Sequence, residues 1–493
     1  MGIVQKQGIQ NTVLAYLGVV LGFLNKVFLF VAFLSDVEYG LVELLITLMV
    51  VGSEVSQLGS SKIILRFFPY FYQHPQREGQ FLFFILVYTL TGFAFFCGVF
   101  LLIDEWLIND YAAETVLFAE RYWLLVPLIF AFSATKALEA ISQSLLKSII
   151  PTFSKQVALR LFHSVAIILY VWLDWPFDTF MLVYVWGYLV PIVLTLGYII
   201  WLGKLRFRWD ASLFRSRIFP ILLVYGLFTS LTEGAVILVN RLDGIMLAEA
   251  FGEAVVAVYG YALYFATLVY IPARSLNAIA VPMVAQQLKK RDMAGVKTLY
   301  QKTAINNLII GALVLIGIWI NLDSFFSLQS RFSEGKNVIG ILGLGVLFNI
   351  STGINRAIIV NSRYYRFDLL ANVIMLGLVF LGNYLLIPIL RVEGAALTTA
   401  LGLLLFNSAG SILIWVKLRI QPFTPKTLIA LGVALLTLLL GILLPKTGWP
   451  VMDIMYRSAI VSVVYLGLIV KLNISPEISN LVFGVLRRLK LMK

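Results

Sequence analysis

Long apolar runs separated by short polar breaks follow one another along most of the chain. A membrane-spanning helix needs about 20 mostly apolar residues, and fourteen runs reach or approach that length. The pattern therefore predicts an all-α, polytopic membrane protein with about fourteen transmembrane helices. The predicted spans lie near residues 10–34, 41–68, 81–103, 115–142, 156–173, 179–202, 219–247, 254–284, 303–326, 337–361, 368–388, 394–416, 427–444 and 456–472.

A strongly basic break, KLRFRWDASLFRSR at 204–217, follows the sixth predicted span. We therefore expect an N-terminal six-helix lobe at 1–203, a basic cytoplasmic linker at 204–217 and a second six-helix lobe at 218–417. Residues 418–493 then hold two extra transmembrane helices and a basic cytoplasmic tail. The turns before the second and eighth spans both lead to a Tyr-Gly pair, so we expect the two lobes to be pseudo-symmetric repeats, a common plan in transporters.

Lysine and arginine residues concentrate in alternate loops. Cytoplasmic loops of membrane proteins carry an excess of these residues, so both termini are expected on the cytoplasmic side, which an even number of spans allows. Of the residues, 60% are hydrophobic and 13% are charged, whereas soluble proteins are about 25% charged. The net charge of +13 therefore reflects membrane orientation, and we expect no nucleic-acid partner.

No enzyme signature is visible in the sequence. It has no Walker loop, and its two histidines and the single Cys97 have no metal-binding spacing. The longest predicted outward loops, near 104–114 and 327–336, are short. Chemistry on a lipid-linked substrate generally needs positioned acids or a metal on an ordered loop. We therefore predict no catalytic residue, no metal and no cofactor.

Charged residues follow one another along the second predicted span at multiples of four: Glu54, Lys62 and Arg66. Ionised groups are costly at membrane depth, so those that persist usually face a bundle interior or a wet cavity. Lys62 and Arg66 lie within about 10 Å of the cytoplasmic end, where they either snorkel to the interface or line a cavity. Glu54 is deeper, which favours an interior position. Lys26 in the first span needs an acid such as Glu43 or Glu54, a polar cavity or an anionic ligand.

The seventh and eighth predicted spans also carry charges. Arg274 lies about 15 Å from the cytoplasmic end of its span, which is deep for snorkelling and favours a guanidinium facing a cavity. Glu233 is nearer the middle of the bilayer and is a candidate proton or cation site. Asp243 and Arg241, near the outer end, either pair with each other or meet water. Glu54, Glu233 and Asp243 are the predicted ion-coupling residues.

Two further polar groups lie inside predicted spans. In the tenth span Asn349, Thr352 and Arg356 follow a helical spacing, which makes Arg356 another candidate contact for an anion. In the fourth span Lys136 and Glu139 are three residues apart, a spacing at which side chains of one helix meet. We therefore predict that Lys136 and Glu139 pair with each other.

Three segments resemble polysaccharide (oligosaccharide-lipid) flippases of the O-antigen flippase type. These proteins belong to the multidrug/oligosaccharidyl-lipid/polysaccharide exporter superfamily. LVNRLDGIMLAEAFGEAVVAVYGYA at 238–262 is similar to their seventh and eighth spans. NYLLIPILRVEGAALTTALG at 383–402 and GSSKIILRFFPYF at 59–71 are similar to spans eleven to twelve and to the basic end of span two.

The resemblance implies two six-helix lobes around a central cavity that opens alternately to each side of the membrane. In such flippases, basic residues of spans one, two and eight are thought to meet the lipid-linked pyrophosphate. The matching positions here are Lys26, then Lys62 or Arg66, then Arg274. A lysine at position 26 departs from the more usual arginine and lacks the bidentate geometry that arginine offers to phosphate.

Taken with the resemblance, the sequence predicts a flippase in a bacterial inner membrane. Its substrate would be undecaprenyl-pyrophosphate-linked oligosaccharide, moved to the outer leaflet for cell-surface polysaccharide such as that of lipopolysaccharide. Membrane lipid and polysaccharide-assembly proteins are the expected partners. The alternatives are a cation-coupled multidrug exporter, which predicts an acid-dominated cavity, and a membrane glycan polymerase or ligase, which predicts a sizeable outer loop. Two spans beyond the twelve typical of multidrug exporters favour the lipid-linked substrate.

Overall fold

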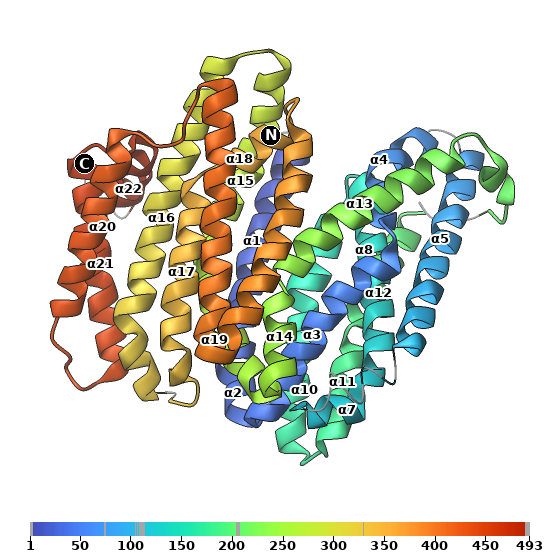
Figure 1. The fold of residues 1–493 in the computed structure, drawn as a ribbon, viewed down its shortest axis with the longest axis horizontal. Coiled ribbons are helices and arrows are strands. Elements are labelled where there is room, and N and C mark those ends of the chain that lie inside the picture. Colours follow the sequence, from blue (N-terminus) through green and yellow to red (C-terminus); the bar gives the residue numbers. More distant parts are fainter. Residues whose placement is uncertain are drawn as a thin grey trace. The chain divides into compact units, whose positions relative to one another are not determined.

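The computed structural model describes residues 3–72, 75–103, 105, 107, 114–203, 208–328 and 330–488. Within these ranges the regular elements are helices and no strand occurs (Figure 1), which confirms the predicted all-α class. Parts of four predicted segments lie outside the described residues: 204–207 of the linker, 489–493 of the tail, and 104, 106, 108–113 and 329 of the two outward loops.

The chain divides into two compact units, Met1–Ala257 and Val258–Lys493. The boundary falls inside one helix, α15 (Glu253–Lys289), so the first unit includes the seventh predicted span. The predicted six-helix lobes at 1–203 and 218–417 stay a prediction.

In the first unit, α3, α5 and α8 pack against one another, and α13 packs against α3 and α4 (Figure 1). A π-helical segment interrupts the first predicted span, and a second one overlaps the start of the fifth. The elements are α1 (Ile3–Phe23), π-helix η1 (Leu24–Leu29), α2 (Phe30–Phe33), α3 (Asp36–Gln57), α4 (Ser60–Tyr72), α5 (Pro75–Leu102), α7 (Val116–Arg121), η3 (Tyr122–Leu124), α8 (Leu125–Ser144), α9 (Ile149–Phe153), π-helix η4 (Ser154–Ala158), α10 (Leu159–Trp172), α11 (Phe177–Gly187), α12 (Leu189–Trp201), η5 (Ala211–Arg215), α13 (Phe219–Val239) and α14 (Leu242–Phe251).

The second predicted span is broken between α3 and α4, so the expectation of one continuous helix at 41–68 is wrong. Leu58 and Gly59 both adopt left-handed backbone conformations, with φ of 46° and 75°. A β-carbon at Gly59 would overlap the carbonyl oxygen of Gly226 on α13. The break therefore lies where another helix crosses at backbone contact, and only glycine combines that φ with that approach.

In the second unit, α16, α20 and α21 enclose an apolar core that includes Ile309, Val433 and Tyr465. One long helical element, α19, contains Arg391 at φ 51° and ψ −124°, so the predicted spans at 368–388 and 394–416 are two helices joined at a kink. The elements are α15, α16 (Met293–Leu328), η6 (Ser333–Gly335), α17 (Lys336–Ser351), α18 (Asn355–Val360), α19 (Tyr365–Leu418), α20 (Pro425–Leu443), α21 (Pro450–Lys471) and α22 (Pro476–Arg488).

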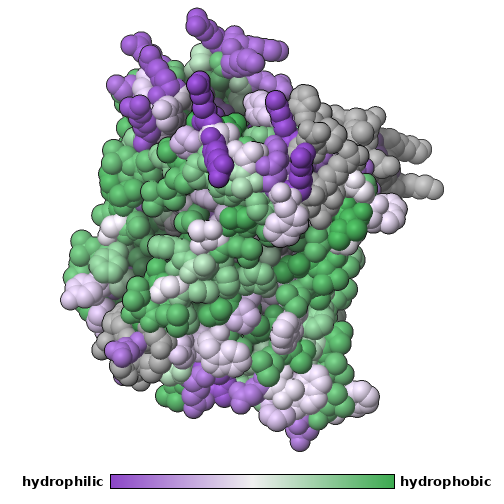
Figure 2. Space-filling view, turned by 90° about the vertical axis from the view of Figure 1, so that its right-hand side faces the viewer, coloured by the Kyte–Doolittle hydropathy of each residue, from purple (hydrophilic) through white to green (hydrophobic). Residues whose placement is uncertain are grey.

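Eleven helices of the described chain are long and apolar enough to cross a membrane. On the face shown in Figure 2, apolar side chains cover the middle and hydrophilic ones gather towards the two ends. The protein is therefore a multi-pass membrane protein. One of the eleven helices is the kinked α19, and the spans predicted at 156–173 and 337–361 correspond to shorter successive helices, α9–η4–α10 and α17–α18. The count of fourteen stays a prediction.

Candidate functional site

Lys26 lies in the π-helix η1 and pairs with an acid of the next span. Its Nζ is 2.5 Å from Oε1 of Glu43 on α3, and the Glu43 side chain is only 6% exposed. The sequence allows an acid, a polar cavity or an anionic ligand beside Lys26, and the structure shows an acid. Single-turn π-segments within helices frequently occur at functional sites.

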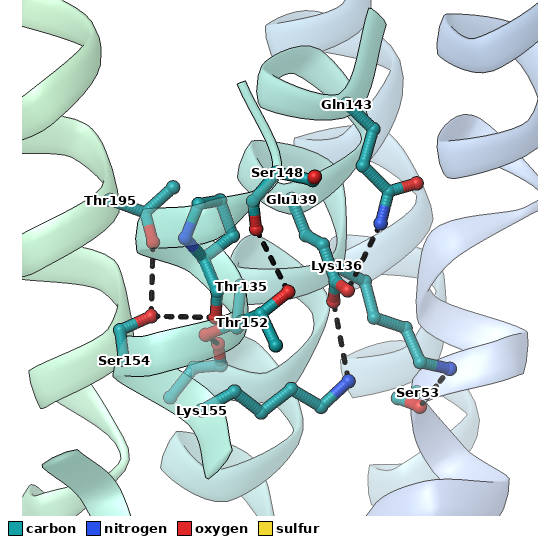
Figure 3. Close-up of polar contacts among 12 residues, drawn as sticks. Ser53, Thr135, Lys136, Glu139, Gln143, Ser148, Thr152, Ser154, Lys155 and Thr195 are labelled. Carbon is teal, nitrogen blue, oxygen red and sulfur yellow. Dashed lines mark hydrogen bonds and ion pairs between the residues drawn. The ribbon is translucent and has the colours of Figure 1, made fainter. Parts of the chain in front are cut away.

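Glu54 on α3 accepts a hydrogen bond from Lys136 on α8. The Lys136 ammonium group also lies 3.4 Å from the Ser53 hydroxyl group (Figure 3). The Glu54 side chain is 13% exposed, as expected for an acid too deep to reach the interface. Glu43 and Glu54 of α3 are both largely shielded from solvent, and each holds a lysine from a neighbouring helical segment, because an unpaired charge would be costly at that depth.

The predicted pair of Lys136 with Glu139 is wrong. Glu139 instead accepts from Lys155 of the π-helix η4, at 3.2 Å, and from Gln143, at 3.1 Å (Figure 3). Residues three apart on a helix are offset by about 60° around its axis, so Lys136 faces α3 whereas Glu139 faces η4. Each of the two charges therefore finds its ionic partner on another helical segment, Lys136 on α3 and Glu139 on η4.

Lys62 and Arg66, both on α4, meet residues of α13. The Lys62 Nζ is 3.2 Å from Oε1 of Glu233. The Arg66 guanidinium carbon lies 4.5 Å from the centroid of the Tyr225 ring and 5.4 Å from that of Phe67, distances at which a cation is attracted to a ring face. The structure therefore brings together Lys62 with Glu233, two residues that the sequence assigned to separate roles.

Asp243 lies at the start of α14, and its side chain is buried. The preceding Arg241 is partly buried, and it lies at the break between α13 and α14. Both residues belong to the first unit, as do Lys26, Lys62, Arg66, Glu54 and Glu233.

The second unit holds the other two predicted site residues. Arg274 on α15 is exposed and makes no hydrogen bond or ion pair with any residue that the structure describes. Arg356 on α18 is held by Asp368 at the start of α19, with Nε–Oδ1 at 3.0 Å and Nη2–Oδ2 at 3.2 Å. Asp368 is buried, so this bidentate pair fixes the guanidinium group strongly.

A buried polar network beside Arg356 was missed by sequence reasoning. The Thr352 hydroxyl and the Asn355 amide group both donate to Oδ1 of Asn407, each at 3.2 Å. Gly353, with φ of 66°, separates α17 from α18 at this point. The predicted alignment of Asn349, Thr352 and Arg356 on one helix therefore does not hold. The sequence feature that could have revealed this network is Asn407, an isolated asparagine in the apolar twelfth predicted span.

Two neighbouring apolar cavities lie among α16, α17 and α20 of the second unit, with volumes of about 660 and 790 Å³. They share Leu344, Leu347 and Leu431 in their walls. Together they form a groove alongside the first of the two extra helices. Its lining suits hydrocarbon rather than a polar solute.

Several known proteins are similar to this chain. A family model described as MatE matches residues 229–385. The structure of the lipid II flippase MurJ in an inward closed conformation superposes with a TM-score of 0.74 at 13% identity, and the match covers 95% of this chain and 100% of that one. The chain has the fold of the MOP exporter superfamily. This confirms the predicted resemblance at superfamily level.

Multidrug transporters of the same superfamily match less completely. An inward-facing MATE family transporter gives a TM-score of 0.63 at 14% identity, over 83% of this chain and 94% of that one. A mutant form of the Vibrio cholerae MATE transporter VcmN gives 0.53 at 14% identity, over 85% and 98%. No curated protein sequence matches this chain.

Proposed function

We propose that the protein is a flippase that moves a polyprenyl-pyrophosphate-linked oligosaccharide from the cytoplasmic to the outer leaflet of a bacterial inner membrane by alternating access. The observation that carries this proposal is the pair of exposed arginines, Arg66 and Arg274, on apolar helices. Neither has a carboxylate partner among the described residues. Arginine in such a setting is a strong ligand for phosphate, because it offers several donors in a planar fork.

Two observations support a lipid-linked substrate over a drug. The match to the lipid II flippase extends over 95% of this chain, whereas the matches to multidrug transporters cover 83% to 85%. The apolar groove beside α20 offers space for hydrocarbon next to the helices that multidrug exporters typically lack. In this proposal the groove receives the polyprenyl chain, and proteins of polysaccharide assembly supply and consume the substrate.

The second candidate function is a cation-coupled multidrug exporter. The observation that favours it is the set of acids inside the first unit, Glu43 and Glu54 among them. Both acids already hold a lysine, so a coupling cation would have to displace an ammonium group. We therefore rank this function second. We propose Glu54, Glu233 or Asp243 as the place where a coupling ion could drive the flippase, and at Glu54 and Glu233 that ion would likewise have to displace a lysine.

The proposal also assigns the chain to transport rather than catalysis. The similar structures are those of a flippase and of transporters. A glycan polymerase or ligase would instead need acids or histidines positioned on an outer loop.

The test is a flipping assay with the purified full chain in liposomes. The liposomes carry a fluorescent sugar linked to polyprenyl pyrophosphate, and transfer between leaflets is followed by a membrane-impermeant quencher. We expect Arg66→Ala and Arg274→Ala each to lower the initial rate by about tenfold or more, the loss of one strong charge-assisted contact. Arg217→Ala, which removes an exposed arginine from the linker, is the control. Full rates in both variants would refute the proposal.

A further inference from the structure

The α4–α13 contact in the first unit sets two pairs of side chains against each other. The helices meet at Gly59 and Gly226, where a β-carbon on Gly226 would lie 2.9 Å from the carbonyl oxygen of Leu58. This close backbone contact fixes the point at which the two segments cross. One turn and two turns after Gly59, the side chains of Lys62 and Arg66 therefore meet fixed positions on α13.

The two cations are met in chemically different ways. Lys62 is paired with the Glu233 carboxylate at 3.2 Å, so its charge is neutralised. Arg66 instead lies over the faces of Tyr225 and Phe67. A ring face attracts the cation but accepts none of its in-plane N–H bonds, so those donors stay available to an anion.

Among the described residues of this unit, the predicted basic site residues form two ion pairs, Lys26–Glu43 and Lys62–Glu233, and the second is the more accessible to solvent. Its two side chains are 39% and 43% exposed, whereas Glu43, the partner of Lys26, is 6% exposed. Ion pairs open to solvent contribute little to stability, while pairs shielded from it are hard to break. An incoming anion can therefore separate Lys62 from Glu233 more easily than Lys26 from Glu43.

We propose that Glu233 is an internal counter-ion, which occupies the Lys62 ammonium group in the empty protein and is displaced by the pyrophosphate of the substrate. The inference rests on the proposed flippase function. Pyrophosphate carries more charge than a carboxylate and has several acceptor oxygens, so it can bind Arg66 first and then compete for Lys62. A second apolar groove, of about 520 Å³ along α13 and lined by Ile221, Val224, Tyr225 and Phe228 among others, provides a surface for the first prenyl units next to the pyrophosphate, whereas the groove beside α20 is proposed for the remainder of the chain.

The exchange has a functional consequence. With Glu233 in place, Lys62 carries no unneutralised charge, so the empty transporter does not retain small anions at this position. Only a ligand that also engages Arg66 gains enough to release the carboxylate. Glu233 thereby raises the selectivity for a diphosphate over single phosphate or carboxylate groups.

Equilibrium binding of farnesyl pyrophosphate to the purified full chain in nanodiscs tests this role. We expect Glu233→Gln to bind the probe about fivefold more tightly than the wild type, because the competing anion is gone. Glu233→Asp should bind like the wild type. Lys62→Gln should bind more weakly, and adding Glu233→Gln to it should give no gain. Glu249→Gln, an exposed acid on α14, makes the same change in net charge and should leave the affinity unchanged.

The outcomes separate this inference from the proposed function. If the wild type binds the probe in an Arg66-dependent way and Glu233→Gln binds no more tightly, the counter-ion role is wrong and the flippase proposal stands. A gain in Glu233→Gln that persists without Lys62, or that Glu249→Gln reproduces, also overturns the counter-ion role. If the wild type binds farnesyl pyrophosphate no better than farnesol, the pyrophosphate site itself is wrong, and both proposals fail.

Discussion

The Lys136 ammonium group of α8 donates a hydrogen bond to the Glu54 carboxylate of α3, and both side chains are largely shielded from solvent. The same stretch of α3 is fixed from another side, because the Ser230 hydroxyl group on α13 donates to the Glu54 carbonyl oxygen at 3.0 Å. Glu54 thus links α3 to α8 through its side chain and to α13 through its backbone.

Removing one charge of the Glu54–Lys136 pair should destabilise the protein more than removing both. Breaking a buried ion pair leaves an uncompensated charge, with a cost on the order of 3 kcal/mol. We therefore expect Glu54→Gln and Lys136→Met each to lower the thermal unfolding midpoint in detergent, and the double variant to recover most of the loss. Additive losses in the double variant would show that the two side chains do not depend on each other.

The contact between α4 and α13 makes a second prediction about stability. A β-carbon on Gly226 would lie 2.7 Å from Cδ1 of Ile63 and from the Tyr88 hydroxyl oxygen, whereas one on Gly234 of the same helix meets nothing within 4 Å. Gly226→Ala should cost about 1–3 kcal/mol through overpacking, while Gly234→Ala should be neutral or slightly stabilising because alanine favours helix. Thermal unfolding of the two variants is the measurement, and equal midpoints would contradict the close packing.

The positions of the helical spans could be predicted from the sequence, because they depend mainly on the lengths of the apolar runs. Each predicted span falls mostly on helical residues, because a helix satisfies the backbone hydrogen bonds of a long apolar segment within the segment itself. The breaks could not be predicted in the same way. The one at Leu58–Gly59 depends on α13 crossing at Gly226, which is a long-range contact that no local pattern of residues contains.

The partners of the charged residues also could not be predicted from the sequence pattern. Spacing along one helix suggests neighbours on that helix, and this logic led to the wrong pair of Lys136 with Glu139. In a membrane, a charge pairs with whatever acid or base a neighbouring helix presents at the same depth. Glu54 and Lys155 fill those places, and their alignment follows only from helix packing.

Substitutions of Arg356 and of Asp368 should lower the stability to a similar extent, but the substitution of Arg356 should weaken substrate binding far more. Their bidentate pair joins α18 to α19, so Arg356→Gln and Asp368→Asn should each lower stability by about 1–3 kcal/mol. If the remaining donors of Arg356 contact the anionic substrate, as we propose, Arg356→Gln should also weaken farnesyl pyrophosphate binding, and Asp368→Asn should do so far less. Equal binding by both variants would leave Arg356 as a purely structural partner of Asp368.

Asp210 in the basic linker should make stability depend on pH below about 4. Its carboxylate accepts hydrogen bonds from the Gln80 side chain, at 2.6 Å, and from the Ser212 backbone, at 2.8 Å. The bond from Gln80 contributes most, and together they lower the pKa of Asp210 from 3.8 to about 2. Because the folded protein has the lower pKa, the stabilisation is complete above pH 4 and is lost as the pH falls through about 2.

The measurement for Asp210 is the thermal unfolding midpoint in detergent between pH 5 and pH 2, compared for matched variants. Other carboxylates also titrate in this window, so the signal is the difference between proteins rather than the slope of one. We expect the unfolding midpoints of Asp210→Asn and Gln80→Leu to lie below that of the wild type at pH 5 and to converge with it towards pH 2. Asp210→Asn lacks the carboxylate and Gln80→Leu lacks its donor, and protonation of Asp210 removes the same charged interaction from the wild type. A constant difference across the range would mean that Gln80 stabilises the linker by packing and not by binding the ionised carboxylate.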